Sequence, residues 1–158
     1  MPYGSYSTPI NASPDRIWEA MLDKAHRPHK YIPFEVLDYK IHEEFPGGIL
    51  REIRTAAMHM IERVTFDRKG DTGTVTFTLV NHPIYDGTIS NHLAPPDAQS
   101  GGQPVVTYTM DVQARSPELE KGPEAEWFIH AAKPEAVAKA VLHLKQMLEG
   151  EAKQEAKA

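Results

Sequence analysis

Hydrophobic and polar positions follow two periods along this chain, and the change of period separates predicted helices from predicted strands. Near the N-terminus, apolar residues recur on one helix face, at Ile17, Trp18, Met21 and Leu22. Ser13 and Pro14 precede them and favour a helix start, because Ser caps free N–H groups and Pro tolerates the first helical turn. We therefore predict a strand over 5–11, a helix from 14 onward and a short second helix around 25–31.

Residues 34–114 alternate between apolar and polar positions, as strands do. In 74–80, Val75, Phe77 and Leu79 share one face and threonines occupy the other, which is typical of a sheet with one solvated side. The stretch 94–104 is rich in Pro and Gly and is predicted to be a loop. The predicted strands of this region cover 34–43, 48–55, 56–66, 74–80, 85–93 and 105–114.

The helical period returns after Pro134. An apolar stripe on an otherwise Lys/Glu-rich segment is formed by Val137, Val141, Leu144 and Leu148. It predicts a helix over 134–149 that docks on the inward face of the sheet, followed by a frayed tail over 150–158. The segment 124–132 is either a turn of helix or a strand extension, and the pattern leaves both open.

One acidic residue, Glu62, interrupts an apolar strand face. In the predicted strand it shares that face with Met58, Met60, Val64 and Phe66, because side chains alternate with period two. A lone carboxylate in an apolar interior is costly, so it indicates a pairing, a ligand or a shifted pKa.

The preceding strand offers a partner in Arg51. Pairing Ile53 with Met58 across a tight turn makes Arg51 and Glu62 diagonal neighbours within reach of each other. Two interpretations stay open: a structural ion pair at the rim of the sheet, or a polar anchor inside a ligand cavity.

Composition narrows the function classes. The length of 158 residues suits a single domain over 1–158. The formal net charge is −5 and no long Lys/Arg stripe is present, which argues against nucleic acid or an anionic membrane as partner. The absence of Cys excludes disulfides, thiolate catalysis and Cys-based zinc sites. The sequence shows no secretory signal and no apolar run that could insert stably in a membrane, so we expect a cytoplasmic protein; its oligomeric state is not indicated.

Histidines give weak metal patterns. His26 and His29 have i, i+3 spacing but no third ligand, so no metal is expected. His130 has Trp127 and Phe128 as neighbours and is expected in a partly buried site near the mouth of the cavity. The remaining candidates are expected to be structural or at the surface: His59, His82, His92 and His143. The sequence has no phosphate-binding loop, nucleophile elbow or HExxH pattern, and no cofactor is expected.

The predicted order of one strand, two short helices, six strands and a long terminal helix resembles the helix-grip fold of the SRPBCC superfamily. That superfamily includes START lipid-transfer domains, the birch pollen allergen and aromatic polyketide cyclases. More narrowly, the chain looks like the AtaL-like subfamily in the segments ASPDRIW (12–18), KYIP (30–33), LREI (50–53), IERV (61–64) and GTISN (87–91). The resemblance implies an α+β fold in which a curved antiparallel sheet of about seven strands wraps around the C-terminal helix, with a cavity between them.

Three functional hypotheses follow. In the first, the cavity binds a small hydrophobic or aromatic molecule and performs cofactor-independent acid/base chemistry of the cyclase or isomerase type. Glu62, raised in pKa by burial or kept ionised by Arg51, would then move a proton, while Tyr108, Tyr85 and Asn91 orient a carbonyl. In the second, the cavity only carries its ligand. In the third, the chain is an interaction module.

The first two hypotheses use the same cavity, and in the second the pair of Arg51 and Glu62 would anchor one polar end of the ligand. The catalytic candidates are Glu62, Arg51 and Tyr108. The ligand-binding candidates are Met58, Met60, Phe77, Tyr85, Asn91, Met110, Trp127, His130 and Leu144.

Overall fold

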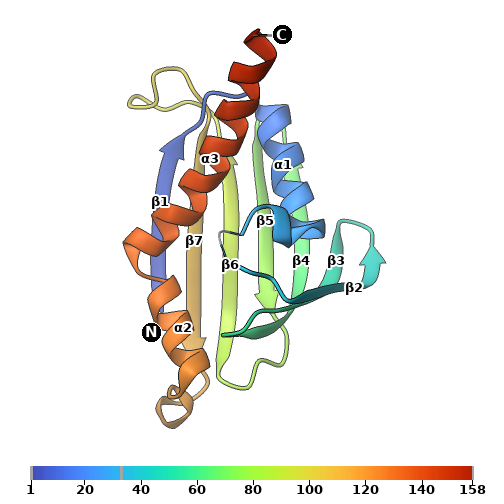
Figure 1. Cartoon of the computed structure of the whole chain (residues 1–158), viewed down its shortest axis with the longest axis vertical. Helices are drawn as coiled ribbons and strands as arrows, with labels where there is room; N and C mark the ends of the chain where they lie inside the picture. Colours follow the sequence, from blue (N-terminus) through green and yellow to red (C-terminus); the bar gives the residue numbers. More distant parts are fainter. Residues whose placement is uncertain (1, 33, 158) are drawn as a thin grey trace.

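A seven-stranded antiparallel sheet forms the body of the molecule in the computed structural model, which describes residues 2–32 and 34–157 (Figure 1). Met1, Pro33 and Ala158, the other residues of the predicted 1–158 domain, lie outside the described residues. The strands are β1 (Tyr3–Pro9), β2 (Asp38–Phe45), β3 (Gly48–Arg54), β4 (His59–Lys69), β5 (Thr72–Leu79), β6 (Tyr85–Ala94) and β7 (Val105–Ala114). They lie in the order β1-β7-β6-β5-β4-β3-β2.

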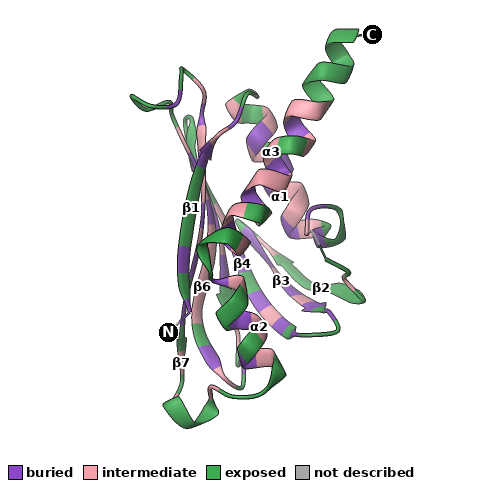
Figure 2. Ribbon diagram, turned by 60° about the vertical axis from the view of Figure 1, so that its left-hand side comes forward, coloured by how far each residue is buried: buried purple, intermediate pink, exposed green. Residues whose placement is uncertain are grey.

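The helices all lie on one face of this sheet, which curves around them (Figures 1 and 2). They are α1 (Pro14–His26), α2 (Pro123–Ala131) and α3 (Pro134–Lys157), with single 3₁₀ turns η1 (Pro28–Lys30) and η2 (Pro117–Leu119). This arrangement confirms the predicted helix-grip fold. The helix α2 also resolves the open alternative for 124–132 in favour of a helix. None of the helices in the described ranges combines the length and apolar character needed to cross a bilayer.

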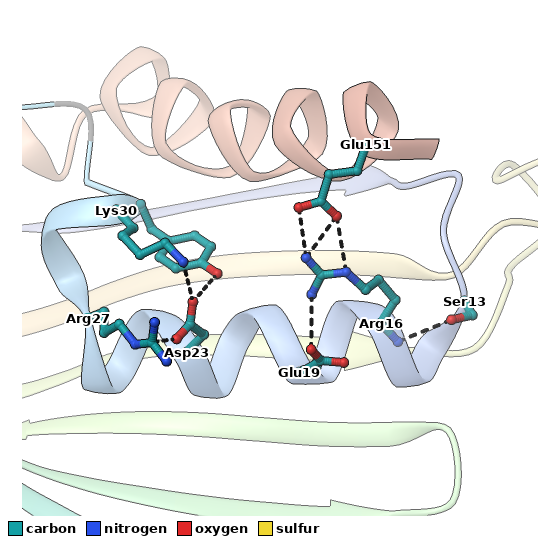
Figure 3. A network of polar contacts seen from close by, with 8 residues as sticks. Ser13, Arg16, Glu19, Asp23, Arg27, Lys30 and Glu151 are labelled. Carbon is teal, nitrogen blue, oxygen red and sulfur yellow. Dashed lines mark hydrogen bonds and ion pairs between the residues drawn. The ribbon is translucent and has the colours of Figure 1, made fainter. Parts of the chain in front are cut away.

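The helix α3 docks through the predicted apolar stripe. Its buried residues are Val137, Val141, Leu144 and Leu148, and they join a core cluster with Val75, Phe77, Val106 and Tyr108 from the sheet. The helix does not end at Glu149 as predicted. It continues through Gly150 to Lys157, although its last turns are exposed (Figure 2). Arg16 of α1 holds Glu151 at 2.8 Å, which fixes a segment predicted to fray (Figure 3).

The helix α1 begins as predicted, since the Ser13 hydroxyl accepts a hydrogen bond from the Arg16 backbone N–H at 3.1 Å. It extends to His26, so the second helix predicted around 25–31 is reduced to the single turn η1. Arg27 separates the two with φ −133° and ψ 68°, because the residue before a proline avoids helical backbone angles.

The register of the β3–β4 hairpin differs from the prediction. Arg51 lies directly opposite Glu62 and Ile53 opposite Met60, so the strands are shifted by two residues relative to the predicted pairing. The turn explains the shift, because Thr55 N–H donates to the Met58 carbonyl and the Thr55 hydroxyl accepts from the backbone N–H of Met58. A shift of two residues preserves the side-chain alternation, so the faces were predicted correctly.

The docking of α3 predicts a large effect of truncating Leu144, which is fully buried in the core. Leu144→Ala should lower the free energy of unfolding by about 2–5 kcal/mol, because it leaves a cavity in close packing. Leu119→Ala, at a position 43% exposed, is the matched control and should change it by less than about 0.5 kcal/mol. Urea unfolding measures both, and equal effects of the two substitutions would contradict the packing described here.

Candidate functional site

A cavity of about 520 Å³ lies between the sheet and the helices. Its lining comes from α1, the segment after η1, strands β3 to β7, α2 and the first turns of α3. Most of these side chains are apolar, including Ile53, Phe77 and Ile89. Such a volume and lining are typical of sites for small organic molecules.

The structure places most of the predicted site residues around this cavity. The predicted residues that line it are Glu62, Arg51, Tyr108, Met58, Met60, Phe77, Asn91, Met110, Trp127 and His130. Tyr85 and Leu144 do not line it. Tyr85 lies under α2, where it packs on Phe128 and donates its hydroxyl to Glu120 at 2.7 Å. Leu144 is beyond the end of the cavity along α3 and packs in the core.

The mouth of the cavity lies where lining residues are also exposed: Phe34, His130, Glu135 and Lys139. Trp127 stands beside it and meets the Phe34 ring edge-on, with 5.8 Å between ring centroids. His130 was expected to be partly buried, but at the mouth of the cavity its side chain is exposed. The mouth is therefore framed by α2, α3 and the segment after η1.

Arg51 and Glu62 form a buried ion pair on the cavity wall. Arg51 Nε donates to Glu62 Oε1 at 3.0 Å, and the two residues are 4% and 1% exposed. Arg51 Nη1 also donates to the carbonyl of Ala25 at 2.9 Å and to that of Lys24 at 3.3 Å, at the C-terminal end of α1. A cation is favourable there because helix carbonyls carry partial negative charge. The pair thus lies inside the cavity wall, and at the same time it joins α1 to the sheet.

Lys24 is the main site residue that was not predicted. Its Nζ donates to Asn91 Oδ1 at 2.9 Å and lies 4.1 Å from the centre of the Tyr108 ring. Burial lowers the pKa of Lys24 to about 7; Arg51 adds to the shift and Glu62 opposes it. Helical spacing could have found it, because Lys24 follows the buried Met21 by three positions and therefore shares the apolar face of α1.

Asn91 supplies an amide group at the same place. It is fully buried, and its Oδ1 is engaged by Lys24. Among the described residues, its Nδ2 is the one buried side-chain polar atom without a hydrogen-bond partner. An unsatisfied buried donor costs about 1–3 kcal/mol, so it calls for an acceptor. Burial also raises the pKa of the nearby Tyr108 hydroxyl, which keeps that group protonated.

The segment after η1 is fixed to the outer face of α1 by Asp23, the residue before Lys24. Asp23 accepts from the Tyr31 hydroxyl at 2.6 Å and from Lys30 Nζ at 3.2 Å, and it pairs with Arg27 at 3.1 Å (Figure 3). Tyr31 lines the cavity. One turn of α1 therefore anchors a cavity wall on its outside and directs Lys24 to the inside.

The histidines have other partners. His26 Nδ1 contacts the Leu22 carbonyl, and His29 stacks on Tyr39. His82, expected to be structural or at the surface, is buried in the loop between β5 and β6 and lies 2.6 Å from Glu124. Over residues 2–32 and 34–157, no three His, Cys, Asp or Glu side chains come together in a group that could hold a metal ion.

Comparison with known proteins adds a family and a fold. The model of the family described as acetylaranotin biosynthesis cluster protein L, AtaL, matches residues 5–150. No curated protein gives a significant sequence match.

Several solved structures share the fold at low identity. A solution structure from Thermobifida fusca has a TM-score of 0.62 and 17% identity, covering 94% of this chain and 93% of that one. The Zhui aromatase/cyclase from Streptomyces sp. R1128 has a TM-score of 0.58 and 17% identity, covering 99% and 96%. A STAR-related lipid transfer protein from Xanthomonas axonopodis has a TM-score of 0.59 and 15% identity, covering 92% and 84%. This chain therefore shares its fold with these three proteins.

The buried ion pair predicts strong coupling between its two members. Arg51→Met leaves Glu62 as an uncompensated buried charge and should cost about 3–5 kcal/mol of unfolding free energy. The double variant Arg51→Met/Glu62→Gln should lose less than the sum of the single losses. Urea unfolding of the four proteins measures the coupling, and additive losses would contradict it. Arg16→Met, which breaks the exposed pair with Glu151, is the control and should cost about 0–1 kcal/mol.

The lowered pKa of Lys24 predicts a pH dependence of stability. Between pH 7 and 9 the unfolded chain binds a proton at Lys24 that the folded chain has largely released, so stability should rise with pH. The charged or ionisable groups facing Lys24 are Arg51, Glu62 and Tyr108, and burial raises the pKa of Tyr108 further away from this window. Lys24→Met should remove this increase. Thermal unfolding of the wild-type protein and of Lys24→Met from pH 7 to 9 measures this dependence. If the unfolding temperatures of the two proteins changed with pH in parallel, Lys24 would not be its cause.

Proposed function

The chain belongs to the AtaL family, and we propose that it binds an apolar small molecule in the cavity. An acceptor oxygen of this molecule would meet the polar end of the cavity, formed by Lys24, Asn91 and Tyr108. The observation that carries this proposal is the unpartnered Asn91 Nδ2 in the wall of a mostly apolar cavity. A carbonyl or similar oxygen placed there would satisfy the donor, while aromatic or aliphatic parts of the ligand contact Phe77, Met60 and Met110.

We further propose that the polar end performs acid/base chemistry without a cofactor, of the cyclase or isomerase type. A lysine with a pKa near 7 exchanges protons readily at neutral pH. Lys24 would take a proton from carbon next to the bound carbonyl, and Asn91 Nδ2 and the Tyr108 hydroxyl would donate to the oxygen as it gains negative charge. A fold of this kind also serves the Zhui aromatase/cyclase, which supports this reaction class without defining a substrate.

In this proposal the roles of Arg51 and Glu62 differ from the sequence-based hypothesis. Their charged groups are engaged with each other and with the end of α1. They hold the wall and set the charge around Lys24, which makes Lys24 the proton-transfer group. The same engagement favours the second candidate function, a carrier, because the residues first expected to react are already paired. An altered ligand after incubation indicates an enzyme, and an unaltered one a carrier.

A pair of naphthalenes of similar shape tests the polar end. The wild-type protein should bind 2-acetylnaphthalene about tenfold more tightly than 2-ethylnaphthalene, because only the ketone can accept from Asn91 Nδ2. Asn91→Leu should abolish the preference while retaining affinity for both compounds. Quenching of tryptophan fluorescence or calorimetry gives the dissociation constants.

The matched control replaces another amide on the neighbouring strand β7. Gln113 is exposed, so Gln113→Leu should keep the preference for the ketone. Failure of both naphthalenes to bind would contradict the proposed cavity function. Equal affinities in the wild-type protein would contradict the role of Asn91.

A further inference from the structure

Lys24 presents a primary amine in an unusual setting. It lies on the last turns of α1, and its Nζ is fixed by Asn91 Oδ1 at 2.9 Å and by the faces of two aromatic rings, Tyr108 at 4.1 Å and Phe77 at 5.6 Å. Among the described residues, no carboxylate lies within ion-pair distance of this Nζ, in contrast to Lys145, which has Glu149 at 2.8 Å. The amine is thus oriented by neutral groups and borders the cavity.

We propose that Lys24 is a nucleophile that forms an imine with an aldehyde or ketone seated in the cavity. The inference rests on the proposed binding function, because the carbonyl must first occupy the polar end. While its nitrogen is bound in the imine, Lys24 cannot also be the base, so this role takes the place of proton abstraction by the same lysine. Asn91 would bring the Lys24 amine and the ligand's carbonyl group together. One end of its amide holds the Lys24 amine, and the other end offers a free donor to a carbonyl oxygen. A carbonyl that accepts from Nδ2 therefore places its carbon beside Nζ.

The step balances without any further reactant. The lone pair of the neutral amine attacks the carbonyl carbon, a C–N bond forms, and the C=O π pair moves to the oxygen. The nitrogen gives up one proton and the oxygen takes one, which yields a carbinolamine. The C–O bond then breaks, the second nitrogen proton leaves with the hydroxyl as water, and a C=N bond remains.

The surroundings keep the amine reactive and the product intact. Lys24 faces Arg51 from β3, Glu62 from β4, Asn91 from β6 and Tyr108 from β7. Burial and the nearby guanidinium lower its pKa to about 7, so a large share of the amine is neutral at pH 7.5. Because Glu62 is already held by Arg51, it does not secure Lys24 as an ammonium ion. Apolar walls exclude much of the water that would hydrolyse the imine.

Reductive trapping on the full chain tests the proposal. The protein is incubated at pH 7.5 with 2-naphthaldehyde and sodium cyanoborohydride, which reduces an imine to a stable secondary amine, and the adduct is located by peptide mapping. Modification should fall on Lys24 at least about tenfold faster than on the exposed Lys121, because burial activates a lysine amine as a nucleophile. Its rate should level off above pH 7 to 8. An adduct spread over surface lysines, or a rate on Lys24 that still rises steeply at pH 9, would overturn the proposal.

Two variants and one competitor sharpen the result. Lys24→Arg keeps a cation but cannot form the imine, so it should lose the preferred adduct, whereas Lys121→Arg should keep it. The alcohol 2-naphthalenemethanol has no electrophilic carbon and should suppress the adduct by filling the cavity. If this alcohol binds and the aldehyde is not trapped on Lys24, the imine proposal fails and the binding function stands. If neither compound binds, both fail. The wild-type peptide map decides even where a variant does not fold.

Discussion

The buried contact between Arg51 and Glu62 constrains the arrangement of the whole cavity. A guanidinium carries several donors and keeps its charge in a protein, so its burial requires acceptors on more than one side. Glu62 supplies them from β4, and the carbonyls at the end of α1 supply them from above the sheet. The end of α1 is thereby fixed over β3 and β4, and with it the backbone from which Lys24 extends.

The burial of Arg51 and Glu62 also determines that Lys24 is the residue of this cluster whose protonation changes near neutral pH. Arg51 and Lys24 are two cations close to one carboxylate in a poorly solvated place. Because arginine does not release its proton near neutral pH, the adjustment falls on the lysine. The ion pair and the low pKa of Lys24 are therefore parts of one electrostatic arrangement. On the outer face of α1, Asp23 binds Tyr31 and Lys30 and so holds the segment after η1 against the helix that carries Lys24 (Figure 3).

Local sequence patterns predict the elements and their faces well, because period and capping are properties of neighbouring residues. The stripe of α3 and the inward position of Glu62 follow from them directly. Periodicity shows which face a residue lies on, but it does not show how far along the element the cavity extends. Tyr85 and Leu144 were therefore predicted to line the cavity, because they share a face with lining residues, although they lie beyond its ends. The β3–β4 register depended on the Thr55 hydroxyl in the turn. Lys24 was missed because a lysine on an amphipathic helix normally belongs to its solvated side.

The sheet order has a consequence for how the chain is made. In the part of the chain that the structure describes, β1 is an edge strand that pairs with β7, the last strand along the sequence, and Tyr6 lies opposite Tyr108. On a ribosome, β1 therefore leaves the exit tunnel long before its partner exists, and it must wait with unpaired backbone groups. Loop closure over such a span is slow compared with hairpin formation in β3 to β6. The polar end of the cavity needs both α1 and Tyr108 of β7, so it is completed only after β7 has been made.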